Sequence, residues 1–117
     1  MHEPMIKITL NTRAAVGTKL ALTAFKKKHK QALMRPIFSE HKRVVQRYTT
    51  DLAQSLIDYQ KRQHEIVVTA GDALIIKRIL QWHNTRYKNG LNDVFDTLDA
   101  GIRLVAQFKE SGDIPHE

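Results

Sequence analysis

The sequence predicts a mainly helical domain of about four helices in a small bundle, with a possible short N-terminal β-strand at residues 5–10. Three observations support this fold class. Apolar residues recur at three-four spacing over most of the chain, Pro36 and two Gly-containing pairs interrupt that spacing, and the first segment alone clearly alternates with a period of two. The length of 117 residues, without a linker or a recognisable internal repeat, fits one domain, 1–117, with a frayed tail at 112–117.

The first two elements are a strand and a long helix. MIKITL at residues 5–10 alternates apolar and polar side chains and is β-branched at several positions, which is typical of a strand. Asn11 or Thr12 then caps a helix expected to run from about Arg13 to Met34. Pro36 ends this helix, because proline lacks a backbone donor and disfavours a helical residue before it. The expected apolar stripe is Val16, Leu20, Ala21, Ala24, Phe25, Ala32 and Leu33.

A second long helix is expected after Pro36, with Ser39 as an alternative cap. The three-four spacing of its seam predicts packing against another helix. The seam residues are Phe38, His41, Val45, Tyr48, Leu52, Leu56 and Tyr59. Residues 65–70 leave two interpretations open. They either form a strand that pairs with residues 6–10, or continue the helix until it ends at Gly71.

Two further helices complete the prediction. Asp72 is expected to cap a helix that runs to about Lys88, and Asn89-Gly90 closes it. Its apolar face is Ile75, Ile76, Ile79, Leu80, His83 and Tyr87. Asn92 then caps a helix from Asp93 to about Glu110. Its inward residues are Val94, Phe95, Leu98, Ile102, Val105 and Phe108.

The positive charge of the chain is concentrated in one segment. The formal net charge is +7, and residues 13–47 hold ten Lys and Arg residues against a single acidic one, Glu40. That segment carries +9 and the rest of the chain −2. A solvated helix face usually mixes charges of both signs, so this segregation favours a polyanionic partner.

We therefore expect this basic helical hairpin to contact the phosphate backbone of a nucleic acid, whether DNA or RNA. Lys7 and Arg13 would extend the footprint. If the two helices form an antiparallel pair about Pro36, Lys30, Arg35 and Lys42 come together at the turn. The candidate contact residues are Lys19, Lys26, Lys27, Lys30, Arg35, Lys42, Arg43 and Arg47.

The strand and the helix after it are also compatible with a ribbon-helix-helix arrangement, in which paired strands from two subunits read the major groove. Lys7 and Thr9 would then be the exposed groove-reading residues. However, the first helix is longer than that motif uses, and Pro36 stands where a compact polar turn is expected. The sequence favours the basic hairpin as the main contact surface.

QWHNTRY at residues 81–87 is the richest small cluster of aromatic and basic side chains. Trp82 and Arg86 are candidates for stacking on nucleic-acid bases. In the favoured alternative interpretation, His83 and Tyr87 close the core, while Trp82 and Arg86 form a cation–π pair on the surface.

Several kinds of chemistry are not indicated. The chain has no Cys, no His pair at helical ligand spacing, and no phosphate-binding loop or nucleophile motif, so we expect no metal, no cofactor and no enzymatic activity. Asp93, Asp96 and Asp99 recur every three residues, and we interpret them as a solvated acidic face that complements the helix dipole.

The sequence thus predicts a non-enzymatic nucleic-acid-binding protein, a regulator or a subunit of a nucleoprotein complex, acting as a homodimer or within a larger assembly. It is expected to be cytoplasmic, with no membrane partner, because neither a signal peptide nor an apolar span is present. The alternative is a helical adaptor or chaperone for an acidic protein, with Phe38, Tyr48 and Tyr59 at its interface. A structural oligomer that self-associates through the same seam is a third hypothesis. Separately, the acidic last helix of one copy could dock on the basic hairpin of another.

Overall fold

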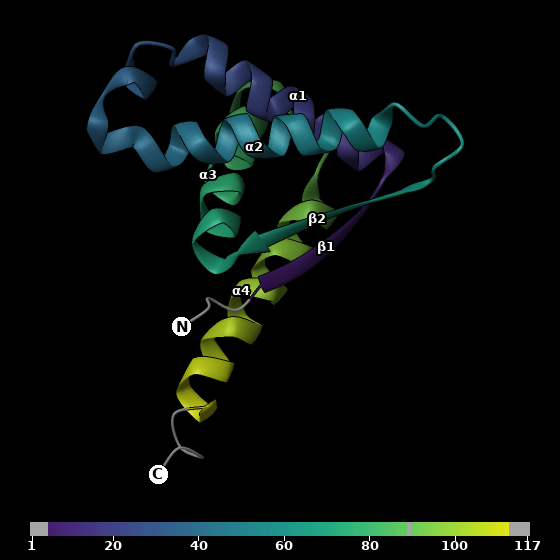
Figure 1. Cartoon of the computed structure of the whole chain (residues 1–117), viewed down its shortest axis with the longest axis vertical. Coiled ribbons are helices and arrows are strands. Elements are labelled where there is room, and N and C mark those ends of the chain that lie inside the picture. The colour runs from purple at the N-terminus through teal and green to yellow at the C-terminus, as the bar shows by residue number, and fades with distance from the viewer. Residues whose placement is uncertain (1–4, 89, 113–117) are drawn as a thin grey trace.

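The computed structural model describes residues 5–88 and 90–112, with side chains up to Arg103. Its elements are β1 (Met5–Asn11), α1 (Thr12–Lys28), α2 (Ser39–Leu56), β2 (Gln63–Thr69), α3 (Ala70–Tyr87) and α4 (Asn92–Gly112). Two short 3-10 turns, η1 (Ala32–Met34) and η2 (Pro36–Phe38), join α1 to α2. In Figure 1, α1 and α2 run side by side at the top. The paired strands lie obliquely below them, and α4 extends toward the bottom of the view. The predicted mainly helical fold of four helices with an N-terminal strand is confirmed.

β1 and β2 form an antiparallel two-stranded ribbon, with Ile8 opposite Ile66 at the centre of the ladder. The strand interpretation of residues 65–70 is therefore correct, and the second helix ends at Leu56, earlier than expected. Side chains alternate between buried and exposed along both strands. The ribbon therefore has one face against the helices and one face open to solvent.

The chain is built from two halves with the same order, strand–helix–helix. The helix caps Asn11 and Thr69 and the central strand residues Ile8 and Ile66 are each 58 positions apart (69 − 11 and 66 − 8). Each cap side chain accepts a hydrogen bond from the backbone amide three residues later, at 2.7 Å for Asn11 and 3.0 Å for Thr69. The packing is reciprocal, since α2 lies on β2 and α4 on β1. The strand register and the caps thus define the same approximate two-fold axis.

The core fills the space between the inner face of the ribbon and the four helices. Some core positions carry the same residue in both halves, as with Ala15 and Ala73 or Leu22 and Leu80, all fully buried. The largest fully buried apolar side chains are Tyr48, Ile8, Leu22, Leu52, Ile76, Ile79, Leu80 and Leu98. The halves share one core, so neither half is a separate domain among the described residues.

α1 ends at Lys28, which corrects the prediction that it reaches Met34. The chain reverses after Lys28, and η1 buries Leu33 against α2. The expected apolar stripe is also partly wrong. Val16 and Leu20 are 50% and 60% exposed, whereas the unpredicted Ala15 and Leu22 are buried. The buried face of α1 is therefore rotated from the one that the largest side chains suggested.

The second and third helices also differ in detail from the prediction. Tyr59 lies beyond the end of α2 and is almost fully exposed, so it is not part of the helix seam. Thr69, not Asp72, caps α3, and Asp72 is a buried residue of its first turn. Tyr87 at the end of α3 is exposed rather than in the core.

α4 follows the prediction where its side chains are described. Val94 and Leu98 are buried, and Phe95 and Ile102 pack against the core. A Cβ atom added at Gly101 would lie 2.6 Å from Cγ2 of Ile6, so glycine permits the close approach of α4 to β1. The predicted roles of Asn89, Val105, Phe108 and the tail at 113–117 lie outside the described residues and side chains.

Candidate nucleic-acid interface

Lysines from α1, from the turn after it and from α2 line a hollow between α1 and α2. Its volume is about 290 Å³, and Lys26, Lys30 and Lys42 surround a floor formed by Leu33 and Val45. The turns η1 and η2 bring α2 back beside α1, which places Lys42 near Lys26 and Lys30. The expected meeting of Lys30, Arg35 and Lys42 is confirmed only for the two lysines. Arg35 is exposed in the same turn region but does not line this hollow.

This basic surface continues along α2. A second, shallower hollow is lined by Ser39, Lys42, Arg43, Gln46 and Arg47. Both hollows include Lys42 and Gln46, so they are contiguous. Five of the eight predicted contact residues therefore lie on one surface, which we call the basic surface: Lys26, Lys30, Lys42, Arg43 and Arg47. Lys19 is half-buried on α1, and Lys27 faces a different hollow, at the ends of α1 and α3.

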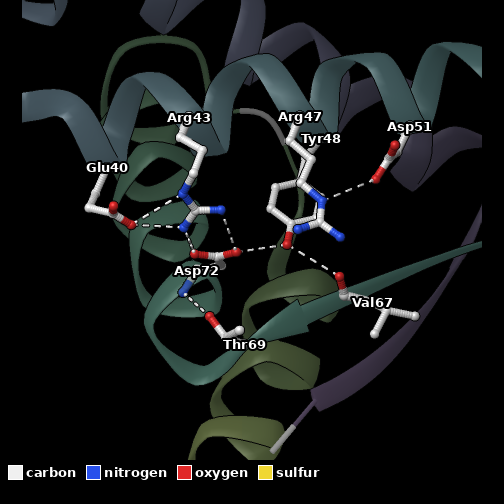
Figure 2. A network of polar contacts seen from close by, with 8 residues as sticks. All are labelled: Glu40, Arg43, Arg47, Tyr48, Asp51, Val67, Thr69 and Asp72. Carbon is white, nitrogen blue, oxygen red and sulfur yellow. Dashed lines mark hydrogen bonds and ion pairs between the residues drawn. The ribbon is translucent and has the colours of Figure 1, made fainter. Parts of the chain in front are cut away.

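Arg43 connects the basic surface to the rest of the molecule. Figure 2 shows its guanidinium between Glu40 on the same helix and Asp72 at the start of α3. Nη2 of Arg43 lies 2.8 Å from Oε2 of Glu40 and 2.5 Å from Oδ1 of Asp72. The hydroxyl of Tyr48 lies 2.8 Å from Oδ2 of Asp72 and 3.2 Å from the carbonyl of Val67. The shorter distance indicates that the hydroxyl donates to the carboxylate.

The protonation states of this network follow from its contacts. Burial alone would raise the pKa of Asp72, but the hydrogen bonds from Arg43 and Tyr48 outweigh it and lower the pKa. Hydrogen bonding to Asp72 and then to Glu40 raises the pKa of Arg43. Burial, followed by the hydrogen bond to Asp72, raises the pKa of Tyr48. The network is therefore an ionised carboxylate held by a cation and a neutral phenol.

The charges of the basic surface are not equally available to a partner. Arg43 has two carboxylate partners, and Arg47 lies 4.0 Å from Asp51. Lys26, Lys30 and Lys42 form no ion pair within the part of the chain that the structure describes, and all three are exposed. We therefore regard these three lysines as the available cations and Arg43 as the residue that positions α2 against α3.

The open face of the ribbon is a second candidate surface, and sequence reasoning identified only its Lys7 and Thr9. Nζ of Lys7 lies 3.3 Å from Oε2 of Glu65 on the other strand, and both side chains are at least half exposed. The face comprises Met5, Lys7, Thr9 and Asn11 from β1 with Gln63, Glu65 and Val67 from β2. Recognising the alternation in QHEIVVT as a strand would have identified the residues that β2 contributes to this face.

The inner face of the ribbon is held by a buried histidine. His64 is fully buried, with Nδ1 2.6 Å from the hydroxyl of Ser55 and Nε2 3.2 Å from the hydroxyl of Thr12. These contacts join β2 to α2 and to the start of α1. Because the inner face is fixed in this way, the outer face presents its side chains from a rigid backbone.

Trp82 and Arg86 form the predicted cation–π pair, with Cζ of Arg86 5.6 Å from the centroid of the indole ring. Trp82 also meets Phe25 edge-on, with ring centroids 5.4 Å apart. His83 belongs to the core as predicted, and burial lowers its pKa. The predicted stacking role of Trp82 and Arg86 stays a prediction.

No group of three metal-binding side chains occurs among the described residues. Of the three acidic residues Asp93, Asp96 and Asp99 on α4, Asp99 forms an ion pair with Lys77 at 2.5 Å. The charge of Asp99 is therefore compensated. No helix in the described part of the chain has the length and apolarity needed to cross a membrane.

No protein-family model, curated protein or solved structure matches the chain. The functional argument therefore depends on the geometry of the two candidate surfaces.

Proposed function

We propose that the chain is a double-stranded DNA-binding protein of the cytoplasm that places the open face of its ribbon in the major groove. The single observation that supports this most strongly is the ribbon itself, a two-stranded element at the centre of a two-fold arrangement whose uncovered face is mostly polar. The order strand–helix–helix, repeated around paired antiparallel strands, is that of a ribbon-helix-helix dimer, here supplied by one chain.

A two-stranded ribbon as the contact element favours duplex DNA over duplex RNA. The major groove of B-form DNA admits a two-stranded ribbon, whereas that of A-form RNA is too narrow for side chains to read. The side chains on the open face suit base edges. Lys7 pairs well with guanine acceptors and Glu65 with the amino group of cytosine. Their mutual ion pair is exposed, so separating them on binding costs about 1 kcal/mol or less.

We expect the basic surface to support such binding from one side. Its residue Arg43 contacts Asp72, three positions beyond the end of β2, so the basic surface begins close to one end of the ribbon. Phosphate contacts by Lys26, Lys30 and Lys42 would hold the duplex in register without reading its sequence. The proposal therefore divides the work between a ribbon that reads bases and lysines that hold phosphates.

The experiment that tests this proposal measures binding to labelled random duplex DNA, single-stranded DNA and duplex RNA across a salt series. We expect duplex DNA to bind best, with affinity falling steeply as salt rises. Lys26→Glu with Lys30→Glu should abolish binding and leave the fold intact, because both side chains are exposed. Lys30→Glu alone should weaken binding far more than Arg78→Glu, an exposed α3 residue with the same charge change.

A second pair of variants separates the two surfaces. Lys7→Ala with Glu65→Ala should relax the preference among duplex sequences by about 1–3 kcal/mol per affected base pair. Lys42→Ala should instead weaken binding to all sequences alike and make the log–log salt slope shallower by about one. Unchanged sequence preference in the ribbon variant would contradict groove reading, even if duplex binding itself persists.

The adaptor hypothesis keeps one specific observation in its favour. Met34 and Ile37 are 74% and 81% exposed in the turn region beside the basic surface, and an acidic protein would cover them. Two of the three contacts expected for this hypothesis do not lie on an exposed helix seam. Tyr48 is buried, and Tyr59 lies beyond the end of α2. Binding of an acidic protein that survives Lys7→Ala with Glu65→Ala but fails in Met34→Asp with Ile37→Asp would favour it.

A further inference from the structure

A separate hollow lies at the opposite end of α1 and α3 from the ribbon. Its volume is about 460 Å³, and its lining is aromatic and basic. The lining residues are Ala24, Lys27, Lys28, Trp82, Arg86 and Tyr87. Because α1 begins directly after β1 and runs for 17 residues, the hollow lies roughly 25 Å along that helix from the ribbon.

Two aromatic side chains line this hollow: Trp82, which packs against other rings, and Tyr87, which is exposed. Trp82 is fixed by edge contacts to Phe25 and His29, with ring centroids 5.4 Å and 5.3 Å away. Tyr87 is 64% exposed although it leans on His83, with centroids 4.8 Å apart. An exposed tyrosine beside a half-buried tryptophan offers a planar ligand an apolar surface that water does not solvate well.

The charge of the hollow is positive. Lys27, Lys28 and Arg86 are exposed, no carboxylate lines the hollow, and none of the three forms an ion pair among the described residues. The ends of α1 and α3 each contribute about half a negative charge. Three cations against these two helix ends leave an excess of about two positive charges, which suits a multiply charged anion.

We propose that this hollow binds a nucleotide, with the base stacked on Tyr87 beside Trp82 and the phosphates held by Lys27, Lys28 and Arg86. A planar aromatic group joined to several negative charges is the ligand chemistry that this combination of side chains fits. The volume falls in the range of small-molecule sites. The site does not depend on the ribbon, so it stands or falls independently of the proposed DNA binding.

Trp82 makes the test direct, because it is the only tryptophan in the chain. The full chain is titrated with ATP that carries a fluorescent methylanthraniloyl group, and energy transfer from the indole to that group is recorded. Transfer that unlabelled ATP reverses is expected. Adenosine and inorganic triphosphate should each compete at least about tenfold more weakly than ATP, because each supplies only one of the two interactions.

Three variants locate the site, and a fourth serves as the control. Lys27→Ala with Lys28→Ala should weaken ATP binding about tenfold or more, and Tyr87→Ala about fivefold or more. Lys61→Ala with Arg62→Ala removes the same charge from exposed positions next to β2 and should leave the affinity unchanged. Arg86→Gln should weaken binding in the same direction as the lysine pair.

Three results would overturn the proposal. The first is an absence of reversible transfer at millimolar ATP, and the second is binding that is indifferent to Tyr87→Ala and to the loss of Lys27 and Lys28. The third is a short single-stranded oligonucleotide that binds over a hundredfold more tightly than ATP with the same variant dependence, since the occupant would then be a strand. Duplex binding by the ribbon is measured separately, so either proposal can fail alone.

Discussion

Asp72 joins the start of α3 to α2 through its buried carboxylate. Its carboxylate is 2% exposed, lies in the first turn of α3 and accepts hydrogen bonds from Arg43 and Tyr48 of α2. A negative charge in the first turn also complements the positive end of the helix dipole. The sequence suggested a cap at this position because Asp is a good capping residue. The partners lie 29 and 24 residues away, so no local rule identifies them.

Removing the Asp72 carboxylate should destabilise the fold. Asp72→Ala leaves Arg43 with Glu40 as its remaining carboxylate and leaves the buried Tyr48 hydroxyl with the weaker Val67 contact. Because Arg43 is partly exposed, we expect a loss of about 2–3 kcal/mol, less than for a fully buried pair. Urea unfolding measures it. Asp51→Ala, which removes the 4.0 Å exposed pair with Arg47, should cost about 0.5 kcal/mol or less.

The same carboxylate should make stability depend on pH. Its pKa in the folded protein is below the unfolded value of about 3.9, so its contribution is complete above about pH 5. As the pH falls further, the unfolded chain takes up the proton first and stability is lost. Urea midpoints at about pH 6 and pH 3 should therefore differ less for Asp72→Asn than for the parent protein. Equal differences would show that Asp72 is not a main contributor to acid sensitivity.

At the scale of elements, sequence patterns predicted most of the boundaries, and errors occurred where tertiary contacts override local preference. The strand at β1, the Asn11 cap and the buried side of α4 followed from spacing alone. The end of α1 did not, because burying Leu33 requires the chain to reverse after Lys28. The open face of the ribbon was half predicted, since Glu65 and Val67 depended on whether residues 65–70 were strand or helix.

The contact between α4 and β1 provides an element-scale prediction. Gly101→Ala should gain about 1 kcal/mol of helix propensity and lose about 1–3 kcal/mol to the clash with Ile6, for a net destabilisation. In an Ile6→Ala background the clash is absent, and the same change should become stabilising. Ala100→Gly, one residue earlier and exposed, supplies the propensity baseline. A Gly101→Ala protein that is more stable than the parent by urea unfolding would disprove the close approach.

At the scale of the whole molecule, the internal two-fold arrangement is what sequence reasoning missed. Equivalent positions share few residues, among them Ile8 with Ile66 and Leu22 with Leu80, because only a few core positions need the same size and shape. The exposed positions have diverged completely on the ribbon. Lys7 corresponds to Glu65 and Thr9 to Val67, each 58 residues apart (65 − 7 and 67 − 9). The backbone is thus nearly symmetric, whereas the side chains on the open face of the ribbon are not.

This asymmetry leads to a prediction about the proposed binding of DNA. Because both strands of the ribbon come from one chain, a single copy should occupy one site, and a second copy is not needed to complete the reading face. The different side chains on the two strands should select a site without inverted symmetry, with about 1–3 kcal/mol lost per mismatched pair. Selection from random duplexes, followed by the mass of the complex in sedimentation, measures both properties. A palindromic site bound only by two chains would show that the ribbon of one chain does not act alone.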